Sequence, residues 1–189
     1  MMKNNPFEVH GVEHLSASSI NQFISSPCHW ILKVSGYKSS SNPAMWRGTA
    51  IDNAICNSFD LDLNKEQKIQ RSIVNAEMDF DSLHEYYQSK KDYDLNDVGK
   101  EREKLEPWVK LGVDFYNKLE WKPIECQRKI EIEFEDIPIP IIGYIDLTYE
   151  DCIRDIKTTA RLLSETPSSI CRQLSLYSVA EDKPALLEF

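Results

Sequence analysis

The sequence has no C-x-x-C pair, although it contains five cysteines. An odd number of widely spaced cysteines gives no disulfide framework and no zinc-ligand spacing, so we expect reduced thiols. The polar start MMKNNPFEVHG also lacks the apolar segment of an export signal. Together these absences predict a cytoplasmic protein.

Long apolar runs and an excess of basic residues are also missing. No run approaches the roughly 20 apolar residues of a membrane-spanning helix, so no membrane contact is expected. The 22 Lys and Arg against 31 Asp and Glu give a net charge of -9, which argues against nonspecific coating of DNA. A local basic strip can still bind DNA. With six Gly and nine Pro there is little room for linkers, and 189 residues predict one domain over 1–189.

Hydrophobic periodicity divides the chain into a helical part, 15–119, and a part with strands, 124–189. Helices are expected at 15–26, 27–35, 45–57, 97–119 and 168–181. Strands are expected at 124–134, 138–149, 152–158 and 184–189. The polar stretch 58–96 predicts short helices and loops. In 97–119 the apolar stripe consists of Leu105, Trp108, Val109, Leu111, Gly112 and Phe115.

Two acids and one lysine stand out in the strand region. Asp146 lies near the end of an apolar strand, and Asp155 and Lys157 lie two apart on the next one. Period two puts Asp155 and Lys157 on one face, and a short turn can bring Asp146 beside Asp155. Two such carboxylates repel unless a divalent cation lies between them, and oxygen ligands suit Mg2+ or Mn2+. The cation would activate water, and Lys157 would orient that water or stabilise the transition state.

An isolated D-x-K is weak evidence, because a strand-end ion pair between Asp155 and Lys157 is the far more common explanation. Neighbouring motifs strengthen the catalytic interpretation. Gln173 and Tyr177 share one face of the helix that follows, although an ordinary amphipathic helix would look the same. Upstream, Gly48 would permit close backbone approach and Asp52 supplies a third acid. Taken on its own, Asp52 is better explained as a solvated helix residue.

Taken in order, these motifs resemble the RecB-like branch of the PD-(D/E)XK nucleases, which includes phage recombination exonucleases. The resemblance rests on five short patterns that are specific only together. They are Leu15-Ser16-Ala17-Ser18, Gly48 to Asp52, Gly143-x-x-Asp146, Asp155-Ile156-Lys157-Thr158 and Gln173-x-x-x-Tyr177.

The resemblance implies an α/β fold with a restriction-endonuclease-like core, a mixed central sheet (αβββαβ) flanked by helices. It implies a Mg2+- or Mn2+-dependent DNA nuclease, an exonuclease of recombination or repair in a bacterial or phage-infected cell. A recombination protein is an expected partner besides DNA. Catalysis would fall to Asp146, Asp155 and Lys157, and metal binding to Asp146, Asp155, the Ile156 carbonyl and Asp52. Accessory or DNA-binding roles are expected for Gln173, Tyr177, Arg47, Arg161 and Arg172.

Three departures leave alternatives open. Relatives often carry His where this chain has Asp52. Relatives with an iron–sulfur cluster have Cys-Pro after the first helix, but here Ser26 precedes Pro27, so no cluster is expected. Relatives also continue past the strand at 184–189, which suggests missing C-terminal elements. A catalytically inactive DNA-binding or protein-interaction module with the same fold is therefore the alternative.

Overall fold

The computed structural model describes residues 6–37, 41–90, 96–119, 121–159 and 164–189. The chain divides into two compact units. Unit 1 contains the described residues up to 37, together with 125–155 and 164–188, and unit 2 contains 41–124 with 156–159 and Phe189. A single domain over 1–189 stays a prediction. Over the described residues, no helix is long and apolar enough to cross a bilayer.

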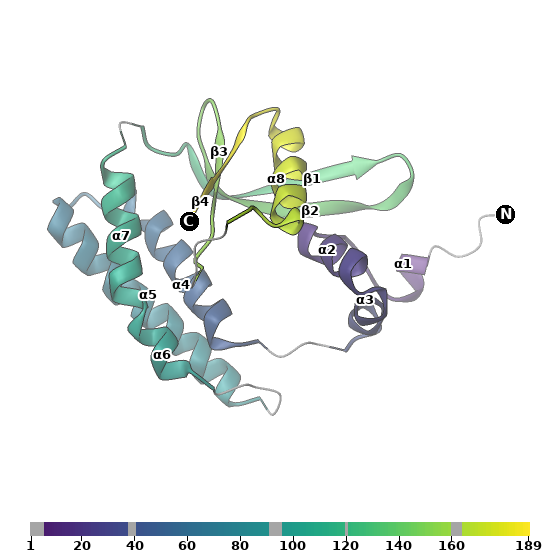
Figure 1. The fold of residues 1–189 in the computed structure, drawn as a ribbon, viewed down its shortest axis with the longest axis horizontal. Coiled ribbons are helices and arrows are strands. Elements are labelled where there is room, and N and C mark those ends of the chain that lie inside the picture. The colour runs from purple at the N-terminus through teal and green to yellow at the C-terminus, as the bar shows by residue number, and fades with distance from the viewer. Residues whose placement is uncertain (1–5, 38–40, 91–95, 120, 160–163) are drawn as a thin grey trace. The chain divides into compact units, whose positions relative to one another are not determined.

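Unit 1 is built on a four-stranded mixed sheet with the strand order β1-β2-β3-β4 (Figure 1). The strands are β1 (Glu125–Phe134), β2 (Ile137–Thr148), β3 (Ile153–Ile156) and β4 (Ala185–Glu188). The first two pairs are antiparallel. Leu15 adds a parallel bridge to Ile141, so the N-terminal segment lines part of β2. The α/β class with a helix-flanked mixed sheet agrees with the prediction.

Helices α1 (Pro6–Val9), α2 (Ala17–Ser25), α3 (Pro27–Val34) and α8 (Ser168–Glu181) complete unit 1. The Ser16 side chain accepts from the Ser19 amide and caps α2, and Pro27 restarts the chain as the first residue of α3. α8 packs on α2, β1 and β4 (Figure 1). A buried cluster joins the sheet to Tyr177 of α8; its other members are Ile130, Ile145 and Ile153. In the chain, α8 follows β3 and precedes β4, and this packing holds the helix against the sheet.

Unit 2 is helical. Its helices are α4 (Pro43–Ser58), α5 (Lys65–Gln88), α6 (Val98–Glu103) and α7 (Leu105–Asn117). α4 packs against α5 and α7, and α5 also packs against α7 (Figure 1). At the α4–α7 contact, a Cβ on Gly112 would come 2.6 Å from Cδ1 of Ile55. A glycine therefore lets these two helices approach closely.

The prediction of short helices and loops over 58–96 was wrong, because α5 alone has 24 residues. Its N-terminus is fixed by a capping box between Asn64 and Gln67, which satisfies backbone donors at the first turn. The buried stripe is narrow and lies among charged residues; its members are Ile69, Ser72, Ile73, Ala76 and Phe80. Tertiary packing of this stripe stabilises a helix whose average composition is polar.

The expected single helix over 97–119 is two helices, α6 and α7, that meet at Lys104. The expected stripe was also partly wrong. Leu105 and Val109 are buried, but Leu111 is 69% exposed and Phe115 is 40% exposed. Val113 and Tyr116 take the buried positions instead, because the start of a new helix at Leu105 sets which residues face α4 and α5.

Candidate active site

Asp146 lies on β2, which pairs with β1 on one side and with β3 on the other. Between β1 and β2, Cys126 pairs with Leu147 and Arg128 pairs with Ile145, so Gln127 falls opposite Asp146. On its other side, β2 pairs Leu147 with Arg154 of β3. Continuing this register by one step sets Asp155 opposite Asp146. Opposed residues of antiparallel strands have Cβ atoms about 4.5–5.5 Å apart on one face of the sheet. The two acids therefore occupy neighbouring positions on adjacent strands.

Gln173 links Asp155 to Tyr177. Its Nε2 donates to Oδ1 of Asp155 at 3.3 Å and to the Tyr177 hydroxyl at 3.2 Å. Since an amide nitrogen has two hydrogens, both contacts can form at once. Asp155 is only 2% exposed, whereas Gln173 is half-buried. Gln173 and Tyr177 are four residues apart and lie on one face of α8. The Gln173 amide therefore contacts both the buried Asp155 carboxylate and the Tyr177 hydroxyl.

Tyr177 lies close to both acids. Burial raises the pKa of the Tyr177 hydroxyl above its ordinary value, and the charges of Asp155 and Asp146 raise it further. The hydrogen bond from Gln173 acts in the opposite direction. The hydroxyl therefore stays protonated at neutral pH. A neutral phenol adds a polar group to the site without adding a third negative charge.

Sequence reasoning missed Gln127. Its Nε2 donates to Oδ1 of Asp146 at 3.3 Å, so Asp146 has an amide partner on β1. Gln127 has a backbone φ of 52°, which is uncommon for a residue other than glycine. The only available signal was indirect: the pairing of the two alternating segments 124–134 and 138–149, which the sequence alone did not align.

Lys157 follows the last residue of β3. It is half-buried, and its Nζ donates to the carbonyl oxygen of Ile156 at 3.5 Å. Lys157 was expected on the strand with Asp155, whereas β3 ends at Ile156. Lys157 and Ile156 belong to the short segment 156–159 that clusters with unit 2.

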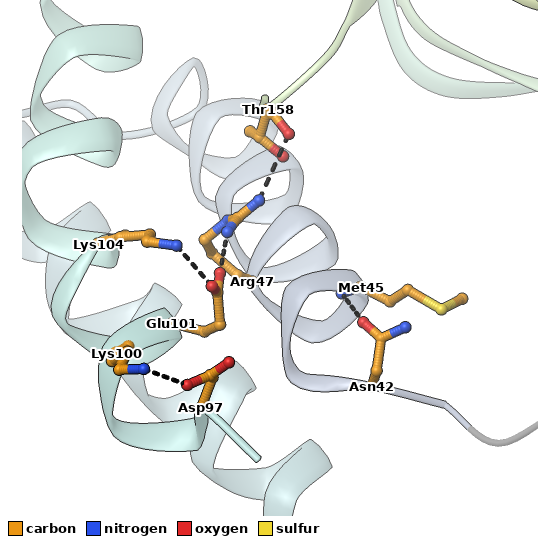
Figure 2. A network of polar contacts seen from close by, with 8 residues as sticks. All are labelled: Asn42, Met45, Arg47, Asp97, Lys100, Glu101, Lys104 and Thr158. Atoms are coloured by element: carbon orange, nitrogen blue, oxygen red, sulfur yellow. Dashed lines mark hydrogen bonds and ion pairs between the residues drawn. The ribbon is translucent and has the colours of Figure 1, made fainter. Parts of the chain in front are cut away.

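Arg47 is buried in unit 2 and paired within it. Its guanidinium contacts Glu101 through Nη1 and donates through Nη2 to the carbonyl of Thr158 at 3.4 Å (Figure 2). The Trp108 ring centroid lies 4.4 Å from Arg47 Cζ. Burial lowers the pKa of Arg47, but an arginine starts so high that it stays charged. This geometry does not test the predicted DNA contact of Arg47, which stays a prediction.

The remaining candidates are spread over the chain. Asp52 is half-buried on α4 of unit 2, so its place in a metal site stays a prediction. Arg172 donates through Nε to Oδ1 of Asn21 at 2.7 Å, which joins α8 to α2. Arg161 lies outside the described residues. Within the described ranges, no group of three or more His, Cys, Asp or Glu could hold a metal ion.

Comparison with known proteins gives one match. The family model of the PD-(D/E)XK nuclease superfamily matches residues 14–186. The matched range includes β1, β2, β3 and α8 together with all the helices of unit 2. No curated protein and no solved structure is significantly similar to the chain.

Proposed function

The chain belongs to the PD-(D/E)XK nuclease superfamily, and on that premise we propose that it is a deoxyribonuclease that depends on Mg2+ or Mn2+. The observation that carries this proposal is the chain of contacts from Asp155 through Gln173 to Tyr177, beside Asp146. We further propose an exonuclease of the RecB-like, phage-type branch, acting in recombination or repair in the cytoplasm of a bacterial or phage-infected cell.

The donor set suits a hard divalent cation. Asp146 and Asp155 would hold it with the carbonyl of Ile156, and Asp52 is a further candidate ligand. Mg2+ commonly uses one or two carboxylates and keeps several waters, so a cluster of three acids is not required. Asp155 is 2% exposed, so its interaction with a bound ion would be screened little by solvent. When bound, the ion supplies Lewis-acid chemistry and offsets charge on the scissile phosphate.

The protein's own groups would orient the reactants. The Gln173 amide restrains the Asp155 carboxylate, so the ligand would be preorganised. Lys157 would place its ammonium group beside the attacked phosphate, where it stabilises developing negative charge. The Tyr177 hydroxyl stays protonated, so it can donate to an anionic oxygen. Arg172 and Arg161 are the proposed contacts to DNA, and a recombination protein is a proposed partner.

The direct test is digestion of linear DNA by the purified chain with Mn2+ or Mg2+. Lys157→Ala should abolish digestion, whereas Lys110→Ala, an exposed lysine of α7, should not change it. End-labelled linear and closed circular substrates separate the exonuclease from an endonuclease, because only the endonuclease cuts the circle. If folded wild type and Lys157→Ala digest DNA at the same rate, the catalytic assignment fails.

A second candidate function is an inactive DNA-binding or protein-interaction module with the same fold. The net charge of -9 favours it, because it argues against strong binding of a polyanion. Calorimetric titration with Mn2+ separates the two functions. Binding that is lost in Asp155→Asn supports the enzyme. A wild type that binds DNA or a protein but shows no Mn2+ binding at millimolar concentration supports the module.

A further inference from the structure

We propose that Arg47 is a positioning residue that holds the segment Ile156–Thr159, which carries Lys157, against α4. The inference rests on the proposed nuclease function, because the position of Lys157 matters for activity only if Lys157 acts in catalysis. Arg47 reaches the segment through one bond, from Nη2 to the Thr158 carbonyl. Thr158 follows Lys157 in the chain. Holding the Thr158 carbonyl in place therefore also restricts the backbone of Lys157, from which the lysine side chain extends.

The guanidinium is held from several sides. Nη1 pairs with Oε2 of Glu101, and the other oxygen of that carboxylate pairs with Lys104 (Figure 2). Trp108 stacks on the guanidinium, an arrangement in which a cation and an aromatic face attract each other. The Arg47 side chain is 6% exposed and that of Glu101 is 13% exposed. A group held on α4, α6 and α7 together has few other conformations, which is what a positioning residue needs.

Gly48 makes a second contact between α4 and the same segment. A Cβ on Gly48 would lie 3.4 Å from Oγ1 of Thr158. The backbone of α4 therefore comes close to Thr158 at the residue that follows Arg47. A side-chain methyl at this position would meet Thr158 in ordinary contact, so the distance reports how near α4 lies to the segment. The bond from Arg47 holds that approach in place.

The burial of Arg47 argues against its use as a phosphate contact. A phosphate oxygen would have to displace Glu101, which compensates the arginine charge in a poorly solvated place. The two roles make opposite predictions for Glu101. If Arg47 bound DNA, neutralising Glu101 would release the arginine and strengthen DNA binding. If Arg47 positions the segment, neutralising Glu101 weakens the hold on Thr158 and leaves DNA binding unchanged.

Hydrogen exchange gives a readout that does not depend on activity. Arg47→Lys and Glu101→Gln should both speed amide exchange in the peptide that contains 156–159, because the Thr158 carbonyl and the Thr159 amide share one peptide group. Lys100→Gln is the matched control. It removes an exposed ion pair with Asp97 on the same helix and should leave exchange at 156–159 unchanged. Equal exchange in wild type, Arg47→Lys and Glu101→Gln would overturn the proposal.

Kinetics then test the consequence. With Mn2+ and linear duplex DNA, kcat should fall about 100-fold in Arg47→Lys, the scale of a misplacement of about 1 Å. In Glu101→Gln it should fall about 10-fold, because the neutral amide still accepts a hydrogen bond. The Kd for a 20-base-pair duplex in EDTA, and its salt dependence, should match wild type in both variants. A phosphate contact would instead lower the salt slope of Arg47→Lys by about one and tighten binding by Glu101→Gln; that result overturns the proposal.

The proposed nuclease function and the positioning role of Arg47 can be contradicted separately. A folded wild type without nuclease activity contradicts the proposed function, and hydrogen exchange then still decides whether Arg47 holds the segment. Full nuclease activity with normal exchange in both variants contradicts the positioning role and leaves the proposed function intact. If Arg47→Lys does not fold, Glu101→Gln carries the test, because it keeps the shape and hydrogen-bonding capacity of the side chain.

Discussion

Gly143 lies directly against the ring of Tyr177. A Cβ on Gly143 would come within 2.5 Å of Cε1 and 3.1 Å of the hydroxyl oxygen of that tyrosine. Two patterns far apart in the sequence, Gly143-x-x-Asp146 and Gln173-x-x-x-Tyr177, thus meet at one contact. Because Gly143 has no side chain, the Tyr177 ring fits against it. The hydroxyl of that ring then lies near Asp146 and Asp155.

Gly143→Ala should lower the free energy of unfolding by about 1–3 kcal/mol, since the added methyl overlaps a buried ring. Urea unfolding measures the loss. Gly99→Ala is the control, because nothing lies within 4 Å of its Cβ and alanine favours the helix; it should be neutral or stabilising. The double variant Gly143→Ala/Tyr177→Leu should lose less than the sum of the single changes. Additive losses would contradict the contact.

Gln127→Asn should weaken the proposed metal site without weakening the fold. Asparagine tolerates a positive φ well, but its side chain is too short to reach Asp146 as Gln127 does. We expect Mn2+ affinity to fall about 10–100-fold, as for other partners of metal ligands, with an unchanged urea midpoint. Calorimetry measures the affinity, and Gln70→Asn on the exposed side of α5 is the control. Unchanged Mn2+ affinity in Gln127→Asn would exclude this role.

Tyr149 should make the fold sensitive to alkali. The hydroxyl is buried and has no hydrogen-bond partner within the described ranges, and burial raises the pKa of Tyr149 to about 12. In the unfolded chain a tyrosine loses its proton near pH 10. The stabilisation that comes from the neutral form is therefore complete below about pH 10 and is lost as the pH rises towards about 12.

Tyr149→Phe tests this sensitivity. The variant should be at least as stable as wild type at pH 7, since it removes a buried hydroxyl without a partner. The stability difference between wild type and variant should move in favour of the variant between pH 10 and 12. Tyr37→Phe, at a side chain that is 74% exposed, should show no such drift. A difference that stays constant with pH would show that Tyr149 ionises as freely as in the unfolded chain.

Patterns within short stretches of sequence predicted much of this fold. The helix expected at 168–181 is α8 with the same limits, because its apolar spacing and the preceding Pro167 are local signals. The strands around Asp146 and Asp155 were expected on adjacent segments, and the observed register agrees with that expectation. The metal-binding and catalytic roles of these acids stay predictions. Local patterns determine which elements form and which residues they carry to one end of a sheet.

The features that were missed depend on partners distant in the sequence. The ion pair of Arg47 was not predicted, because its partner Glu101 is 54 residues away. Gln127 acquires its partner only through the register of two strands. α5 was missed because its narrow apolar stripe lies among acids, so the average polarity of the segment hid it. The ion pair and the strand register are tertiary contacts that no local window contains, and α5 depends on the tertiary packing of its narrow stripe.

The bond between Asn21 and the carbonyl of Ser169 spans 148 residues. During synthesis, α2 therefore leaves the ribosome long before α8 exists. At about 5–20 residues per second the delay is roughly 7 to 30 s. Throughout that time Phe23 and Ile24, which stay about half exposed even after folding, have no α8 beside them. Helices α4 to α7 find their partners within 43–117 and can form first. Aggregation of the nascent N-terminal helices should therefore limit the yield on overproduction, and slower translation in the presence of chaperones should raise it.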